Sequence, residues 1–247
     1  MRYKVTIEYD GTNFLGWQRQ QDGLSIEQSL EDAIFAFSQQ QIEVFGAGRT
    51  DAGVHALAQV AHFDLETKSD CFRIREALNA HLRDAGRDIS ILEVTEADAD
   101  FHARFSATKR SYIYKIINRR APSVLMKNRA WWIPLPLDVE KMKEGAKYFL
   151  GNHDFTSFRA SLCQALSPIK TLDKFEIIHK NNETITCYIE AKSFLHHQVR
   201  NMVGTLKMVG DGTLQPQDIQ KILEAKDRTK AGPTAPAHGL YLNKISY

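Results

Sequence analysis

Segments with the two-residue period of a strand alternate along this chain with segments that have the period of a helix. In the first half, strand patterns cover 3–11, 42–48, 59–65 and 89–97, and helix patterns cover 24–40 and 72–82. Ser25 is placed to cap the first of these helices. The resulting β-α-β-β-α-β order is typical of the split arrangement of ferredoxin-like folds.

The second half has the same character. Strand patterns cover 111–118, 172–180, 184–194 and 239–247, and helix patterns cover 139–151, 195–210 and 216–225. We therefore predict an α+β fold of two ferredoxin-like α/β subdomains, residues 1–105 and 106–247, whose antiparallel sheets join into one extended sheet.

The composition bounds the class of protein. Among the 247 residues, 43% are apolar, yet no apolar run is long enough to cross a bilayer, and the chain starts in a strand pattern rather than a signal peptide. Cys71, Cys163 and Cys187 lie far apart and form no C-x-x-C pair, which argues against disulfides and against a zinc site. We expect a cytoplasmic protein with reduced thiols and no membrane contact.

Charge is unevenly distributed along a chain whose net charge is only +2. Residues 102–130 contain five Arg, three Lys and no acidic residue, whereas residues 84–100 contain four Asp and two Glu. Phe105, Tyr112 and Tyr114 lie within the basic run. Cations interspersed with aromatic rings suit the phosphates and stacked bases of RNA. A solvated surface without a partner is the alternative.

The stretch GAGRTDAGVHALAQVAHFD, residues 46–64, gathers glycines around one cation and one carboxylate. It lacks the spacing of a dinucleotide or phosphate loop, so no nucleotide cofactor is expected. Glycine permits close approach of another backbone, which we interpret as clearance for a substrate strand. Arg49 would lower the pKa of Asp51 and hold it ionised, as a nucleophile or base requires. The alternative is an aspartate that only forms the turn.

The histidines show no spacing suited to a metal. His55 and His62 fall on opposite faces of one strand, and His196 and His197 diverge by about 100° on the predicted helix. No carboxylate-rich or cysteine ligand set accompanies them. We therefore expect structural or RNA-contacting histidines and no metal.

Arg200 is a further candidate. His196, Arg200 and Gly204 are spaced four residues apart, so they share one side of the predicted helix, and Gly204 would let another segment pack close to Arg200. Two interpretations stay open: a partner of a buried carboxylate, or an arginine whose stem covers the edge of the core.

Together, several stretches resemble the tRNA pseudouridine synthase A family. In order, they are YDGTNFLGWQRQ, GAGRTDAGVHALAQVAHF, FHARFSATKRSYIYKI, GNHDFTSFRA, FLHHQVRNMVGTL and GLYL. The resemblance runs from about Tyr3 to Tyr247. It implies an isomerase that converts uridine to pseudouridine at positions 38, 39 and 40 of the tRNA anticodon stem-loop, and that works as a homodimer without cofactor or metal.

The resemblance also implies roles for individual residues. Asp51 matches the catalytic aspartate, and Arg200 matches the basic residue paired with it. Tyr112 matches the tyrosine that stacks on the target uracil, and Arg49 the arginine that helps to displace the base. Ser111 stands where relatives often have another basic residue, which would weaken a phosphate contact.

In the implied mechanism, the target base leaves its stack, Asp51 promotes cleavage of the C1′–N1 bond, the uracil rotates, and C5 joins C1′. Whether Asp51 attacks the sugar, attacks the ring or removes a ribose proton is open. Two rival functions are a non-catalytic stem-loop RNA-binding protein and a hydrolase that uses Asp51 with a histidine or metal. A bare carboxylate near phosphates argues against the first, and the missing ligand spacings argue against the second.

Overall fold

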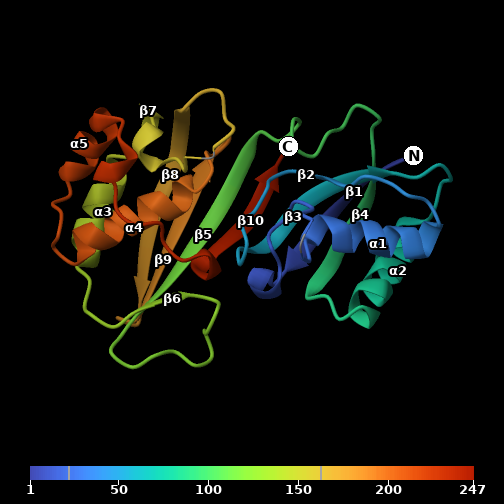
Figure 1. Cartoon of the computed structure of the whole chain (residues 1–247), viewed down its shortest axis with the longest axis horizontal. Helices are drawn as coiled ribbons and strands as arrows, with labels where there is room; N and C mark the ends of the chain where they lie inside the picture. Colours follow the sequence, from blue (N-terminus) through green and yellow to red (C-terminus); the bar gives the residue numbers. More distant parts are fainter. Residues whose placement is uncertain (22, 162) are drawn as a thin grey trace. The chain divides into compact units, whose positions relative to one another are not determined.

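The computed structural model describes residues 1–21, 23–161 and 163–247. Its contacts divide the chain into two compact units (Figure 1). Unit 1 comprises residues 1–108 and 241–247, and unit 2 comprises residues 109–240. The division at 108 is close to the predicted boundary at 105. The last strand, which the sequence assigned to the second half, belongs to unit 1.

Unit 1 is built on a mixed sheet. Its strands are β1 (Arg2–Tyr9), β2 (Phe45–Gly46), β3 (His55–Asp64), β4 (Ile89–Ala97) and β10 (Leu240–Ser246). β1 lies between β4 and β3 and is antiparallel to both, and β2 is antiparallel to β3. The order β4-β1-β3-β2 is that of a split β-α-β arrangement. β10 runs parallel to β3, beside residues 55 and 56, so the prediction of a purely antiparallel sheet is wrong here.

Helices α1 (Ile26–Ser38) and α2 (Cys71–Asp84) pack on each other and on the sheet of unit 1 (Figure 1). The Ser25 side chain accepts a hydrogen bond from the Gln28 amide, which confirms the predicted N-cap. Each helix buries one apolar stripe, as its periodicity predicts. The buried members are Ile26, Leu30, Ala33 and Ile34 in α1 and Ile74, Leu78 and Leu82 in α2.

Unit 2 also contains a mixed sheet. Its strands are β5 (Lys109–Asn118), β6 (Trp131–Ile133), β7 (Gly151–Asp154), β8 (Ile169–Lys180) and β9 (Thr184–Ala191). The order β5-β9-β8-β7 is antiparallel throughout, and β6 adds to β5 in parallel. The predicted hairpin of β8 and β9 is confirmed. The predicted joining of the two sheets into one stays a prediction.

The helices of unit 2 are α3 (Val139–Lys147), α4 (Gln198–Gly210) and α5 (Asp218–Ala225). The predicted helix over 139–151 ends earlier than expected, at Lys147, and Gly151, with a φ of 97°, already begins β7. The predicted helix over 195–210 begins only at Gln198, because His197 has a left-handed backbone. The described residues of the chain also form short 3-10 helices: η1 (Gly11–Asn13), η2 (Thr156–Phe158), η3 (Arg228–Lys230) and η4 (Ala237–Gly239).

Two further observations concern the class of protein. No helix in the described part of the chain is both long and apolar enough to cross a membrane. All three cysteines are free thiols, and Cys187 is fully buried in β9. That burial raises the pKa of Cys187 to about 12, so this thiol stays protonated at neutral pH.

Candidate active site

The loop between β2 and β3 holds Arg49 and Asp51, and neighbouring backbone ties it down on both sides. The amide of Trp17 donates to the carbonyl of Thr50 at 3.0 Å, and the side chain of Gln59 donates to the carbonyl of Gly48 at 2.7 Å. The amide of Val54 closes the turn by donating to the carbonyl of Asp51 at 3.1 Å. The loop is therefore a defined part of unit 1 rather than a loose connection.

Thr50 is buried in this loop, and Arg49 and Asp51 flank it. Its side-chain hydroxyl lies 2.8 Å from the hydroxyl of Tyr9 on β1. The Arg49 side chain is exposed, and Asp51 is half-buried. Arg49 and Asp51 thus lie on one short accessible segment, and Thr50 between them anchors this segment to β1.

Gly46 at the start of the loop and Gly16 beside the loop both pack closely against other segments of this chain. A Cβ at Gly46 would lie 2.5 Å from the indole ring of Trp17, and a Cβ at Gly16 would lie 2.5 Å from the carbonyl oxygen of Thr50. The segment that contains Trp17 therefore occupies the space beside Gly46. Our interpretation of that clearance as room for a substrate strand is wrong at this position, because the chain's own side chain fills it.

The histidines of β3 are structural. His55 is buried, its Nδ1 accepts a hydrogen bond from the amide of Gly11 at 3.0 Å, and its ring stacks on Tyr241 at 4.7 Å. His62 is also buried, and its Nδ1 accepts from the amide of Ala103 at 3.2 Å. Burial lowers the pKa of His62 to about 4, so its ring is neutral at physiological pH.

Unit 2 carries Tyr112 on β5, paired in register with Ile189 of β9. The ring is only 9% exposed and packs edge-on against Phe194, with ring centroids 5.2 Å apart. A neighbouring ring of this kind restricts the rotation of an aromatic side chain, so Tyr112 is held in one orientation.

Tyr114 lies two residues further along β5, on the same face as Tyr112. Sequence reasoning assigned Tyr114 only to the basic aromatic run. It is fully buried, and its hydroxyl donates to the carbonyl of Pro236 at 2.8 Å. Burial raises the pKa of Tyr114 well above its ordinary value, although the positive charge of Arg200 acts in the opposite direction. Tyr114 is thus a neutral donor that interacts with the charge of Arg200, and it lies next to Tyr112 along one face of β5.

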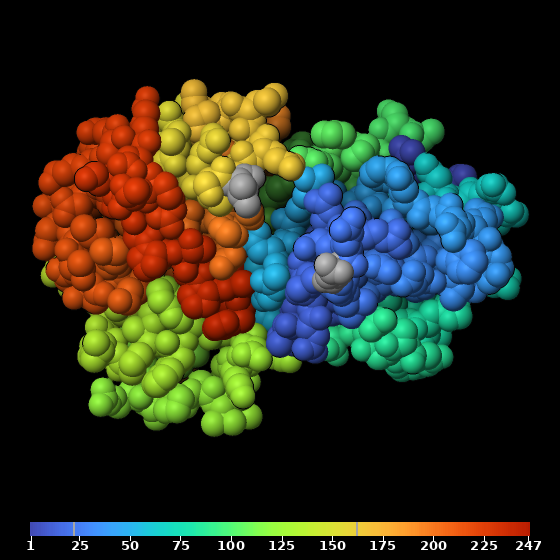
Figure 2. All heavy atoms as spheres, in the orientation of Figure 1, coloured from blue at the N-terminus to red at the C-terminus, as the bar shows by residue number. Residues whose placement is uncertain are grey.

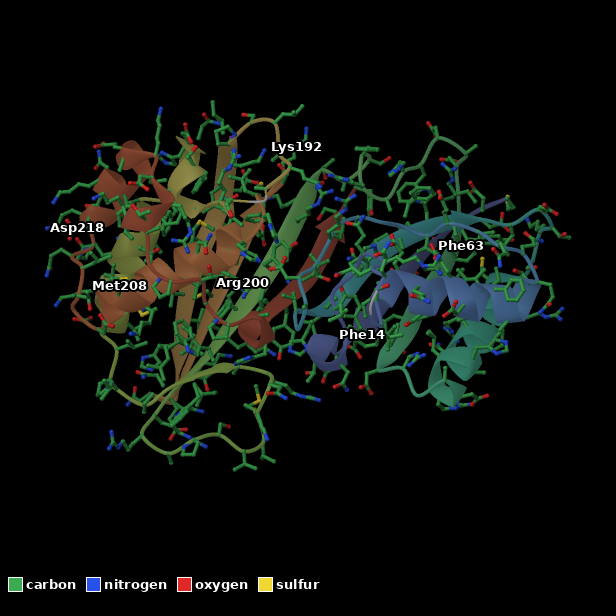
Figure 3. All side chains as sticks on the ribbon, viewed as in Figure 1. Phe14, Phe63, Lys192, Arg200, Met208 and Asp218 are labelled. Atoms are coloured by element: carbon green, nitrogen blue, oxygen red, sulfur yellow. The ribbon has the colours of Figure 1, made fainter. Side chains whose placement is uncertain are left out.

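Arg200 is half-buried in the first turn of α4 (Figure 3). Its Nε donates to the carbonyl of Ala235 at 2.8 Å, and its own carbonyl accepts from the amide of Ala235 at 3.2 Å. A Cβ at Gly204, one turn further on, would overlap the carbonyl oxygen of Pro233. The predicted close packing beside Gly204 is therefore confirmed, and the segment that packs there belongs to this chain.

The predicted geometry of the two neighbouring histidines is wrong. His196 and His197 precede α4, and the left-handed φ of 62° at His197 turns the chain there. Their rings approach to 4.0 Å between centroids instead of diverging around a helix. His196 consequently does not share a helical side with Arg200 and Gly204.

Some of the cations in the basic run of residues 102–130 form ion pairs with carboxylates of the protein itself. Arg119 pairs with Glu183 at 3.0 Å, and Lys109 lies 3.6 Å from Glu190. Arg120 is exposed on the connection between β5 and β6, which projects from unit 2 (yellow-green in Figure 2). Ser111 is buried in β5, with its hydroxyl 3.5 Å from Glu190, and the predicted weakening of a phosphate contact at this position stays a prediction.

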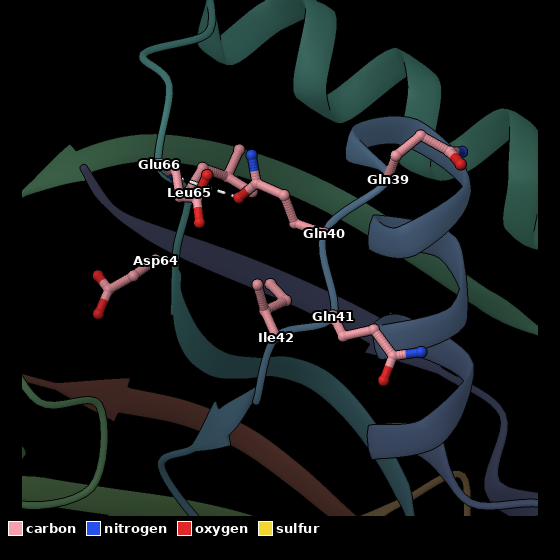
Figure 4. A pocket seen from close by; sticks show the side chains of 7 residues that line it. All are labelled: Gln39, Gln40, Gln41, Ile42, Asp64, Leu65 and Glu66. Atoms are coloured by element: carbon pink, nitrogen blue, oxygen red, sulfur yellow. Dashed lines mark hydrogen bonds between the residues drawn. The ribbon is translucent and has the colours of Figure 1, made fainter.

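A pocket in unit 1 lies between the end of α1 and the end of β3 (Figure 4). Its lining consists of residues 39–42 and 64–66, and the amide of Glu66 donates across it to the side chain of Gln40 at 3.1 Å. None of the predicted site residues lines it. Of those four residues, Arg49 and Asp51 lie together in unit 1, and Tyr112 and Arg200 lie in unit 2.

Comparison with known proteins defines the family. The sequence model of a family described as tRNA pseudouridine synthase matches residues 5–106 and 146–247. A tRNA pseudouridine synthase A from Paramagnetospirillum magneticum is 54% identical over 246 residues, which span 100% of this chain and 95% of that protein. Proteins of the same name from Ehrlichia chaffeensis and Rhizobium meliloti are 55% and 48% identical, over 100% of this chain and 100% and 99% of theirs.

A match of this extent, along the whole chain, defines the class of this protein. The chain belongs to the tRNA pseudouridine synthase family.

Proposed function

We propose that this protein isomerises uridine to pseudouridine in tRNA, at positions 38, 39 and 40 of the anticodon stem-loop. The observation that carries the proposal is the likeness to tRNA pseudouridine synthases A along the whole chain, at 54–55% identity for two of them. The supporting structural feature is the tethered loop of unit 1, which presents Asp51 at the surface beside an arginine.

The reaction needs no outside reactant, because every bond that breaks or forms belongs to one nucleotide. The C1′–N1 bond breaks, the uracil rotates, and a C1′–C5 bond forms. C5 then loses its proton, and N1 gains one. A carboxylate suits this sequence because an ionised oxygen can act as nucleophile or base, and we propose Asp51 for that role.

The other predicted residues have distinct proposed roles. Tyr112 stacks on the detached uracil and keeps it near the sugar, which its fixed ring orientation supports. Arg200 is the cation that acts with Asp51 in catalysis, and Arg49 takes part in displacing the base from its stack. The exposed cations of residues 102–130 bind tRNA phosphates.

The test is release of tritium from tRNA that contains 5-³H-uridine, because the C5 hydrogen leaves only when the new bond forms. We expect release by the wild type and none by Asp51→Asn, with tRNA binding retained by the variant. Asp84→Asn, at the exposed end of α2, is the matched control and should release tritium like the wild type. Addition of EDTA should change none of these results.

Two outcomes would contradict the proposal. Tight tRNA binding by a wild type that releases no tritium would indicate a non-catalytic RNA-binding protein. Full activity of Asp51→Asn would remove the carboxylate from the mechanism. Mapping the pseudouridines in the product tRNA decides whether positions 38, 39 and 40 are the targets.

We further propose that the protein is a cytoplasmic homodimer, as the family resemblance implies. Sedimentation equilibrium of the purified chain tests the dimer. A mass near that of one chain, 28.1 kDa, at the concentrations used for catalysis would contradict it.

A further inference from the structure

A short segment of unit 2, residues 231–236, lies directly on the first turns of α4, and we call it the strap. The amide of Gly232 donates to the side chain of Thr205 at 2.9 Å. A Cβ at Gly232 would lie 2.9 Å from the carbonyl oxygen of Gly204, and a Cβ at Gly204 would overlap the carbonyl of Pro233. Two glycines therefore allow the strap and the helix to approach backbone to backbone.

Near its C-terminal end, the strap is hydrogen-bonded to Arg200. As described above, Ala235 accepts from the Nε of Arg200 and donates its amide to the carbonyl of the same residue. This pair of bonds joins one strap residue to both the backbone and the guanidinium of Arg200. A shift of the strap along α4 consequently moves the guanidinium.

Arg228 in η3 holds the strap in place. One of its terminal nitrogens donates to the carbonyls of Ala231 and Gly232, at 3.3 and 3.0 Å. The other donates to the side-chain oxygens of Asn201, at 3.1 Å, and Thr234, at 3.2 Å. Arg228 thus contacts the first turn of α4 and the strap at the same time.

Asn201 completes the connection from the helix side. It is fully buried, next to Arg200 in the chain. Its oxygen accepts from Thr234 at 2.7 Å as well as from Arg228, and its amide nitrogen donates to the carbonyl of Phe158 at 2.8 Å. Both groups of the Asn201 side chain are therefore satisfied, and the network has a single geometry.

The guanidinium of Arg228 is held by neutral oxygens. Its acceptors in the described part of the chain are neutral oxygens, and no carboxylate forms an ion pair with it there. Burial lowers the pKa of its guanidinium. Partial desolvation of a cation without an opposite charge costs free energy. The planar guanidinium offsets this cost, because its N–H groups donate hydrogen bonds to several oxygens at once.

We infer that Arg228 is a positioning residue, which fixes the strap on α4 and, through Ala235, the direction of the Arg200 guanidinium. The inference rests on the catalytic role proposed above for Arg200. Arg228 does not touch the substrate in this scheme. Lysine cannot replace it fully, because a single ammonium cannot reproduce the planar fork that reaches the strap and Asn201 together.

The test combines rates with a double-mutant cycle on the full chain. Arg228→Ala should lower the single-turnover rate of tritium release about tenfold to a hundredfold, with the Kd for tRNA changed less than about threefold. Arg228→Lys should restore part of the rate. In an Arg200→Ala background, Arg228→Ala should cause little further loss, because the two residues act as one unit.

Asn118→Ala is the matched control, since the Asn118 side chain also donates to two backbone carbonyls of unit 2, those of Ile133 and Leu135, which lie outside the strap. A second readout does not depend on catalysis. Hydrogen exchange of the Gly232 and Ala235 amides should become faster in Arg228→Ala and stay unchanged in Asn118→Ala. If Arg228→Ala fails to fold, Arg228→Lys and Thr234→Ala serve for the same measurements.

The outcomes separate the two proposals. Independent, additive rate losses of Arg200→Ala and Arg228→Ala, or unchanged amide exchange in Arg228→Ala, would overturn the positioning role and leave the proposed function intact. A wild type that releases no tritium would overturn the proposed function, and with it any role of Arg228 in catalysis.

Discussion

The hydroxyl of Thr50 lies 2.8 Å from the hydroxyl of Tyr9, so the residue between Arg49 and Asp51 is tied to strand β1 of the sheet. This contact links the core of unit 1 to the proposed catalytic carboxylate. A loop fixed in this way presents its side chains with little conformational freedom, which catalysis by a positioned carboxylate requires.

Tyr9→Phe should therefore impair the reaction more than its effect on folding explains. Loss of one buried hydrogen bond costs about 1 kcal/mol of unfolding free energy, whereas misplacement of Asp51 should lower the rate of tritium release about tenfold. Tyr3→Phe is the control, because Tyr3 lies on the same strand and donates to the carbonyl of Ser69, away from the loop. Equal rates for the two variants in single-turnover assays would contradict a positioning role for the Tyr9 contact.

Gly16→Ala should destabilise unit 1 and displace the Asp51 loop. Gly16 has a φ of 101°, and its added Cβ would lie 2.5 Å from the carbonyl oxygen of Thr50. Gly86 is a useful comparison, because its φ of 65° lies in the left-handed region that other residues can reach, and no atom lies within 4 Å of its Cβ position. We expect a cost of about 1 kcal/mol for Gly86→Ala and a clearly larger one for Gly16→Ala in urea unfolding. Identical midpoints would show that the loop moves away without cost.

The salt dependence of tRNA binding should distinguish two neighbouring arginines. Arg120 is exposed, whereas Arg119 already pairs with Glu183. Removal of a phosphate contact reduces the slope of log K against log salt by about 0.7–0.9. Arg120→Ala should show a reduction of this size, and Arg119→Ala a smaller one, in filter-binding titrations over a series of salt concentrations. The reverse order would assign the phosphate contact to Arg119 rather than to Arg120.

Acidification should destabilise the protein between pH 6.5 and 4, in part through His62. Burial lowers the pKa of His62 from 6.5 to about 4 in the folded chain. Over this range the unfolded chain binds the proton and the folded chain does not, so the unfolding free energy falls as pH falls. His102, 4.7 Å away, has its pKa lowered as well and adds to the same trend.

His62→Gln should flatten this profile, because glutamine can still accept from the Ala103 amide but has no proton to gain. Urea unfolding at several pH values within that window provides the measurement. The same pH dependence in His62→Gln and in the wild type would assign the acid sensitivity to other groups.

Several elements were predictable because local rules are sufficient for them. The apolar stripe of α1 and the capping side chain of Ser25 define that helix without tertiary information. The strand patterns of β1, β4 and β5 likewise predict these strands, with ends that differ from the observed ones by about two residues or fewer. By contrast, the strand predicted over 42–48 is reduced to Phe45–Gly46, because pairing with β3 takes up only those two residues.

The sequence by itself determined the local elements and the chemistry that the chain carries. Asp51 next to Arg49 in a glycine-rich turn, and Tyr112 in a strand, are visible in the order of residues alone. Only the tertiary structure decided that β10 pairs with β3 and that Trp17 fills the space beside Gly46. The same holds for the Arg228 network, which links η3, the strap and α4. The physical reason is range: periodicity and capping act over a few residues, whereas these contacts join segments that meet only once the chain has folded.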